Sequence, residues 1–161
     1  MIDMESRTAC FTGHRELPTD DLPEISKRLE DTLVKLIEQG YRYFGAGGAL
    51  GFDTLAAQVV LRLRERYPQI RLILVLPCLN QTRGWPQADI DAYEEIKRCA
   101  DKVTYTSEHY FRGCMQKRNR HLVDNSSIPA VAACGSSISQ AQIACKSALY
   151  ANKPPELPFH R

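Results

Sequence analysis

The sequence lacks any apolar run near the roughly 18 residues that a membrane-spanning helix needs. It also lacks a signal peptide, so we expect no membrane segment and a cytoplasmic location. None of its six cysteines falls in a Cys-x-x-Cys pair, and none clusters with a pair of histidines. This spacing fits neither a zinc site nor a disulfide scaffold, and we expect that no metal or cofactor is required.

An excess of charge of one sign is also missing. A net charge of +2 is too small to indicate a nucleic-acid partner, so nucleic acid is not the expected ligand. The chain contains no internal repeat, low-complexity tract or linker. Its 161 residues therefore predict a single domain over residues 1–161, which ends in a proline-rich tail over residues 151–161.

What the sequence does contain is a regular alternation of short apolar runs with amphipathic segments. The runs at residues 8–12, 41–45, 70–76, 102–106 and 128–134 predict strands. The segments between them, and residues 139–150, are predicted to be helices. This order predicts an α/β fold, a doubly wound and mostly parallel sheet of about five or six strands flanked by helices. Ligands of such sheets lie beyond the carboxyl ends of the strands, so the loops after the strands form the candidate site.

The second predicted strand leads into a turn with four glycines in seven residues, followed by an amphipathic helix. Gly47, Gly48 and Gly51 would let the backbone approach a ligand, while free N–H groups and the helix dipole favour an anion. The same glycines would equally serve a tight turn that needs them only for their backbone angles. In the first helical turn, Asp53 or Thr54 would meet a ribose, although Asp53 could equally cap the helix.

The first predicted strand ends in residues that could also contact a ligand. Thr12, Gly13, His14 and Arg15 offer a hydroxyl, a flexible turn, an imidazole and a guanidinium. Arg15 suits a phosphate or carboxylate through bidentate hydrogen bonds, unless it is simply solvated. His14 either contacts the ligand or merely turns the chain.

Two later segments carry cations beside groups that bind bases or brace loops. Arg83 and Trp85 lie in a polar loop, where the ring could stack on a base or fold onto its own loop. Arg118 and Asn119 lie in a predicted helix, with Asn119 near its apolar face. A buried asparagine needs partners, so it either braces a loop or touches a ligand, while the neighbouring cations could be a solvated face.

After the last predicted strand, Gly135, Ser136, Ser137 and Ser139 lead into a helix. Their N–H and hydroxyl groups could hold an anion, or the serines could be plain helix caps. No sequence pattern indicates a catalytic nucleophile beside a general base; Cys134, for example, has no histidine near it in sequence. The sequence therefore favours a binding site over a catalytic one.

Taken together, these motifs resemble the SLOG superfamily, whose members include the DprA and LOG proteins, and within it the YpsA-like branch of bacterial proteins. The resemblance runs from Thr8 to about Tyr150 and rests on residues 12–15, 47–57, 76–81 with Trp85, and 118–126. It implies a Rossmann-like fold and a pocket for a nucleotide or nucleotide-derived ligand. Members of this fold often dimerise, so the resemblance is compatible with a homodimer.

Two departures from the family pattern bear on activity. The YpsA-like branch usually carries a Gly-Gly-Thr element where this chain has the serines at 136–139. The LOG phosphoribohydrolases place a catalytic glutamate at the position of Gln142, and an amide cannot act as a general base. In contrast, Met115 and Arg118 resemble the LOG Met-x-x-Arg element, which implies that Arg118 contacts the ligand.

We therefore expect a protein that binds or senses a nucleotide or a derivative such as ADP-ribose, NAD or an AMP-like molecule, without catalysis. The alternatives are a LOG-type nucleotide N-glycosidase or phosphoribohydrolase, and a DprA-like nucleic-acid-binding module. The residues expected to contact the ligand are Thr12, Gly13, Arg15, Gly47, Gly48, Ala49, Gly51, Asp53, Thr54, Arg83, Trp85, Arg118, Asn119, Gly135, Ser136, Ser137 and Ser139.

Overall fold

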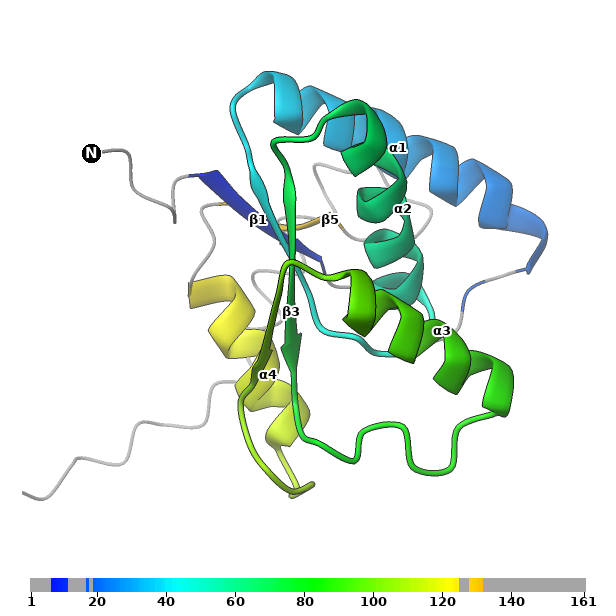
Figure 1. The fold of residues 1–161 in the computed structure, drawn as a ribbon, viewed down its shortest axis with the longest axis vertical. Coiled ribbons are helices and arrows are strands. Elements are labelled where there is room, and N and C mark those ends of the chain that lie inside the picture. Colours follow the sequence, from blue (N-terminus) through cyan, green and yellow to red (C-terminus); the bar gives the residue numbers. More distant parts are fainter. Residues whose placement is uncertain (1–6, 12–16, 18, 125–127, 132–161) are drawn as a thin grey trace, which may run out of the picture.

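The computed structural model describes residues 7–11, 17, 19–124 and 128–131, and these form one sheet with helices on both faces (Figure 1). The strands are β1 (Thr8–Phe11), β2 (Tyr43–Ala46), β3 (Arg71–Leu76), β4 (Lys102–Tyr105) and β5 (Ile128–Val131). They lie in the order β4-β3-β2-β1-β5, and each neighbouring pair is parallel. The parallel α/β sheet predicted from the alternation of apolar runs is therefore confirmed.

The helices divide into two layers because the strand order reverses at β1. They are α1 (Leu22–Glu38, preceded by the 3-10 turn η2, Thr19–Asp21), α2 (Phe52–Arg66), α3 (Gln87–Cys99) and α4 (Cys114–Asp124). From β1 to β4 the chain steps across the sheet in one direction, and α1, α2 and α3 cover one face (Figure 1). The return to β5, beside β1, brings α4 to the opposite face, where it packs against β3 and β5.

The core lies between the sheet and the three-helix layer. The ring of Phe11 in β1 stacks on Phe44 at 6.2 Å between ring centroids and meets Phe52 of α2 edge-on at 6.4 Å. All three phenylalanines are almost completely buried. In β3, Leu72 and Leu74 are also buried, as expected for an apolar strand that has helices on both faces.

This topology places one set of loops together. Since the strands are parallel, β2, β3 and β4 end at the same edge, and residues 47–51, 77–86 and 106–113 follow there (Figure 1). In the described ranges, no helix combines the length and apolar character that a membrane span requires. The helix predicted over residues 139–150 and the tail over 151–161 lie outside the described residues.

Candidate functional site

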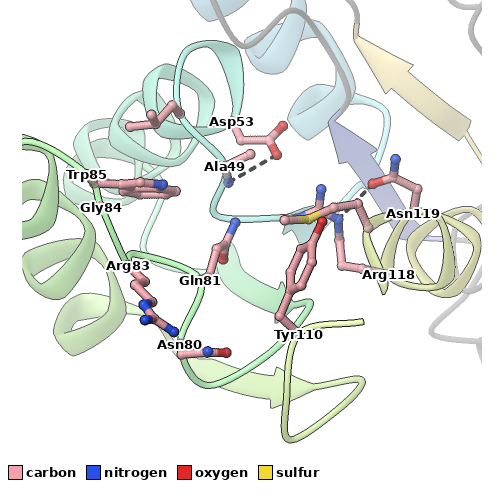
Figure 2. A pocket seen from close by; sticks show the side chains of 12 residues that line it. Ala49, Asp53, Asn80, Gln81, Arg83, Gly84, Trp85, Tyr110, Arg118 and Asn119 are labelled. Carbon is pink, nitrogen blue, oxygen red and sulfur yellow. Dashed lines mark hydrogen bonds between the residues drawn. The ribbon is translucent and has the colours of Figure 1, made fainter. Parts of the chain in front are cut away.

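A cavity of about 590 Å³ lies at the carboxyl edge of the sheet, where these three loops meet α4 (Figure 2). Its size is within the range of small-molecule sites. It is lined by the glycine turn and α2 (Ala49, Leu50, Asp53), the loop after β3 (Asn80, Gln81, Arg83, Gly84, Trp85), the loop after β4 (Tyr110) and α4 (Met115, Arg118, Asn119). Six residues that the sequence predicted as ligand contacts are thereby brought together: Ala49, Asp53, Arg83, Trp85, Arg118 and Asn119.

The glycine turn needs its glycines for two different reasons. Gly48 and Gly51 have φ angles of 70° and 79°, which favour glycine over residues with a side chain. Gly47 is needed for space instead, because a Cβ there would lie 2.5 Å from Nη1 of Arg118. The interpretation that all three glycines serve only their backbone angles is therefore wrong for Gly47, which makes room for a cation of α4.

The guanidinium of Arg118 is the best-buried charge of the site, with only 4% of the residue exposed. Its Nη1 donates to the carbonyl of Gly47, and its Nε donates to Oδ1 of Asn119 at 2.7 Å. These bonds use two of the five N–H groups of the guanidinium. Burial lowers the pKa of Arg118, and the negative charge of Asp53 opposes that shift. Asn119 thus braces Arg118, and α4 presents to the cavity a cation whose other three N–H groups have no acceptor among the described residues.

Asp53 supplies a carboxylate to the same cavity from the first turn of α2. Its Oδ2 accepts the N–H of Ala49 at 3.3 Å, while Gly51 occupies the helix cap without a side-chain hydrogen bond. Asp53 therefore braces the glycine turn, and its interpretation as the helix cap is wrong. Burial raises its pKa from 3.8 to about 6, although Arg118 and the Ala49 bond act in the opposite direction. The hydroxyl of Thr54 donates to the carbonyl of Ala49 at 2.9 Å and so holds the same turn.

The loop after β3 combines an aromatic ring with an exposed cation. The ring of Trp85 meets Tyr93 edge-on, with 5.6 Å between centroids, and packs partly against the core. Arg83 is exposed and also lines the cavity. The ring of Trp85 thus packs against α3 and not onto its own loop, and it also borders the cavity. Its stacking on a base stays a prediction.

Sequence reasoning did not single out Asn80, Gln81, Gly84, Tyr110 or Met115 as contacts, although they line the cavity. Gln81 is 7% exposed, and neither atom of its amide group has a hydrogen-bond partner. The sequence feature that could have predicted Asn80 and Gln81 as contacts is their position, since both are polar and follow a buried strand. Burial of a loop amide depends on tertiary packing, which a local pattern does not encode.

Two predicted parts of the site lie outside the described residues. These are the loop after β1, with Thr12, Gly13, His14 and Arg15, and the segment with Gly135, Ser136, Ser137, Ser139 and Gln142. Their roles stay predictions. Among the described residues, no group of three or more histidine, cysteine, aspartate or glutamate side chains is arranged to hold a metal ion.

Comparison with known proteins shows which proteins this chain is similar to. The model of the YspA SLOG family matches residues 11–131 of the chain. A UPF0398 protein of Halalkalibacterium halodurans is 35% identical over 104 residues, which cover 63% of this chain and 55% of that relative. The UPF0398 protein YpsA of Bacillus subtilis is 23% identical over 104 residues, 63% of this chain and 58% of the relative. The matched part of this chain thus spans little more than half the length of these relatives.

One solved structure has a similar fold at low sequence identity. It is DNA processing protein A from Helicobacter pylori, whose single-stranded DNA binding mode that structure describes. The TM-score is 0.53 at 17% identity, and the match covers 91% of this chain and 64% of the other. At this identity, the likeness shows a shared fold alone.

Proposed function

The chain belongs to the YspA SLOG family, and from that premise we propose that the cavity binds a nucleotide or a nucleotide-derived ligand without turning it over. ADP-ribose, NAD and AMP-like molecules are the first candidates. The observation that carries the proposal is the buried guanidinium of Arg118, which borders the cavity beside the N-terminus of α2 and uses two of its five N–H groups on described residues.

The anionic part of such a ligand would lie between Arg118 and the glycine turn. The first N–H groups of a helix have no acceptor within the helix, and its dipole favours negative charge there. Gly51 begins α2 directly beside Ala49 and Leu50, which line the cavity. A guanidinium adds charge-assisted hydrogen bonds in a planar geometry that matches phosphate. The two features together favour a phosphate over a neutral group.

The remaining part of the ligand would meet aromatic and acidic groups. Trp85 and Tyr110 border the cavity from two different loops, and either ring offers a face or an edge to a base. The second carboxylate oxygen of Asp53, Oδ1, accepts no hydrogen bond from the described residues, and it could accept from ribose hydroxyls. An anion site, a carboxylate and two rings around one cavity are the complement of a nucleotide.

Calorimetric titration with ADP-ribose, NAD, AMP and cyclic nucleotides tests this proposal. Because Trp85 is the single tryptophan of the chain, a change in its fluorescence on binding also places the ligand in the cavity. We expect Arg118→Met to weaken binding tenfold or more, the order expected for losing charged hydrogen bonds. The matched control is Arg120→Met, an exposed arginine of the same helix, which should leave the affinity unchanged. Absence of binding by the wild type would contradict the proposal.

The same samples test the hydrolase alternative. Asp53 gives the cavity a carboxylate, so chromatography of each nucleotide after long incubation with the protein should be included. Release of a free base or of ribose 5-phosphate would show that the ligand is turned over. We expect intact nucleotide.

Single-stranded nucleic acid is a second candidate, and one surface feature favours it. The large hydrophobic side chains exposed in the described ranges are Leu79, Tyr110 and Phe111. Leu79 and Glu108 join the two loops that carry them through a backbone hydrogen bond of 3.2 Å. Nζ of Lys117 lies 6.0 Å from the centroid of the Phe111 ring. Exposed rings beside cations are how proteins stack successive bases of a single strand.

The small net charge of the chain is now a weaker argument against a nucleic-acid ligand. A strand would meet the local charge beside the exposed rings, such as that of Lys117, and not the average over the whole chain. DNA processing protein A, which has a similar fold, binds single-stranded DNA, and this supports the second candidate. A gel-shift series with oligothymidylates at low salt tests it, with Tyr110→Ala as the variant. Binding that grows with strand length and falls in Tyr110→Ala would favour a strand over a mononucleotide. No shift at low salt would exclude it.

A further inference from the structure

One polar group of the cavity is unexplained by the contacts described so far. Gln81 is 7% exposed, and neither its Nε2 nor its Oε1 has a hydrogen-bond partner among the residues that the structure describes. Buried side-chain amides normally have partners, and an unpaired buried group destabilises the folded state. The loop after β3 therefore holds a donor and an acceptor in reserve next to the candidate ligand site.

The position of this amide sets what it could touch. Figure 2 shows Gln81 between Trp85 on one side and Arg118 on the other, facing the glycine turn. Its Oε1 lies 3.6 Å from the place that a Cβ on Gly48 would occupy, so the amide abuts the turn closely. Gln81 also lines the cavity, so a ligand that fills the cavity would lie against this residue.

The chemistry of the amide narrows the kind of group it would bind. An amide offers one donor and one acceptor side by side and carries no charge, so it is poorly matched to a phosphate. A base edge that carries an acceptor next to a donor is its complement. Glutamine makes this bidentate pair with the N6 and N7 atoms of adenine, whereas the corresponding edge of guanine presents two acceptors. The ring of Trp85 borders the same part of the cavity.

We propose that Gln81 is the residue that selects the base of the ligand, and that the base is adenine. This inference rests on the proposed nucleotide site and names its ligand class: adenine nucleotides, with the base at Gln81 and Trp85 and the phosphate at Arg118. Gln81, Trp85 and Arg118 would then each meet a different part of the ligand.

Four probes test the inference by calorimetry: AMP, GMP, the 5′-monophosphate of purine riboside, which lacks the 6-amino group, and ribose 5-phosphate, which lacks a base. For the wild type we expect AMP to bind about tenfold or more tighter than the purine riboside nucleotide. In Gln81→Met, which keeps the volume and removes the amide, this preference should fall to less than about twofold. Ribose 5-phosphate should bind both proteins alike.

The control variant is Gln116→Met, the same chemical change at an exposed position of α4, and it should keep the preference for AMP. If nucleotides and ribose 5-phosphate bind but Gln81→Met keeps the AMP preference, the inference about Gln81 is overturned while the nucleotide site stands. A preference for GMP would likewise overturn the assignment to adenine. If none of the probes binds the wild type, the proposed function itself fails.

Discussion

The two edges of the sheet use the same residue types in opposite ways. At the amino edge of β3 and β4, the carboxylate of Asp101 accepts Nη1 of Arg64 and the N–H of Leu72, each at 2.8 Å. Nη1 of Arg64 also donates to the carbonyl of Cys99 at 3.0 Å. Asp101, Arg64 and the backbone at the start of β3 thus provide hydrogen-bond partners for one another. This edge is complete without a ligand.

At the carboxyl edge, an aspartate and an arginine are more deeply buried but are not paired. Asp53 and Arg118 interact electrostatically, yet no ion pair within 4.0 Å joins them in the described structure. The amide of Gln81 and the hydroxyl of Tyr93 have no hydrogen-bond partner either within the described part of the chain. The polar groups described at the amino edge thus have partners within the protein, whereas several buried polar groups at the carboxyl edge have none among the described residues. An edge that retains unsatisfied polar groups is where a ligand is expected to bind.

The largest expected effect concerns the pH dependence of stability. The pKa of Asp53 is about 6 in the folded protein, above the 3.8 of an unperturbed aspartate. Between these values the folded protein holds a proton that the unfolded chain has released, so the free energy of unfolding decreases as pH rises from about 4 to about 6. Asp53→Asn removes this titration, while its amide oxygen can still accept the N–H of Ala49. The free energy of unfolding of the variant, relative to that of the wild type, should therefore increase by up to about 3 kcal/mol from about pH 4 to about pH 6.

Urea unfolding at a series of pH values measures this gain. Asp20→Asn, at an exposed aspartate before α1, is the control, and its stability should follow the wild type at every pH. If the free energy of unfolding of Asp53→Asn and of the wild type changed with pH in the same way, the pKa of Asp53 would not be raised by folding. The contrast between the two edges would then lose its main support.

The next effect tests how tightly the glycine turn is packed. A Cβ on Gly48 would lie 2.5 Å from Cδ2 of the buried Leu76, and the φ angle of 70° adds backbone strain. Gly48→Ala should therefore reduce the free energy of unfolding by about 2 kcal/mol or more. Gly40→Ala is the matched control, since its φ of 102° is also positive but no atom lies within 4 Å of the added carbon. Equal losses by chemical unfolding would show that backbone angle, not space, dictates glycine at 48.

Much of this organisation could be predicted from the sequence. The apolar run of β3 and the glycines after β2 predicted the parallel sheet and the edge that carries the candidate site, because both signals are local. Asp53 was expected to contact a ligand because it follows the glycine turn, and Trp85 because it lies in a polar loop after β3. What the sequence could not give was contact between distant segments. Gly47 makes room for an arginine 71 positions later, and no pattern within either segment shows that pairing.

The roles of individual side chains were harder to predict than their presence. Asp53 braces the turn rather than the helix cap, because the N–H of Ala49 lies within its reach. The unpaired state of Gln81 arises from the way its loop packs against the turn and is invisible in a list of polar residues. Side-chain partners depend on tertiary geometry, so the sequence predicted which side chains line the cavity better than which partners they have there.

A smaller effect is expected at the amino edge. Asp101→Ala would leave the N–H of the buried Leu72 without its side-chain acceptor and remove the ion pair with Arg64. Because the pair is partly exposed, we expect a loss of about 1 to 2 kcal/mol of stability. Asp101→Asn, which retains an acceptor, should recover part of it. Nucleotide affinity should stay within about twofold of the wild type, and a large change by calorimetry would contradict the separation of the two edges.

The smallest effect is the most informative about the carboxyl edge. Replacing Gln81 by methionine removes an amide without partners and fills nearly the same volume, so stability should rise by about 1 kcal/mol. Thermal unfolding of Gln81→Met beside Gln116→Met measures this gain, with no change expected for the exposed glutamine. If a buried water instead bridged Gln81 to the hydroxyl of Tyr93, the substitution would strand that hydroxyl and lower the melting temperature. A residue whose removal stabilises the protein while abolishing the preference for AMP is retained for a ligand, since packing alone would select against it.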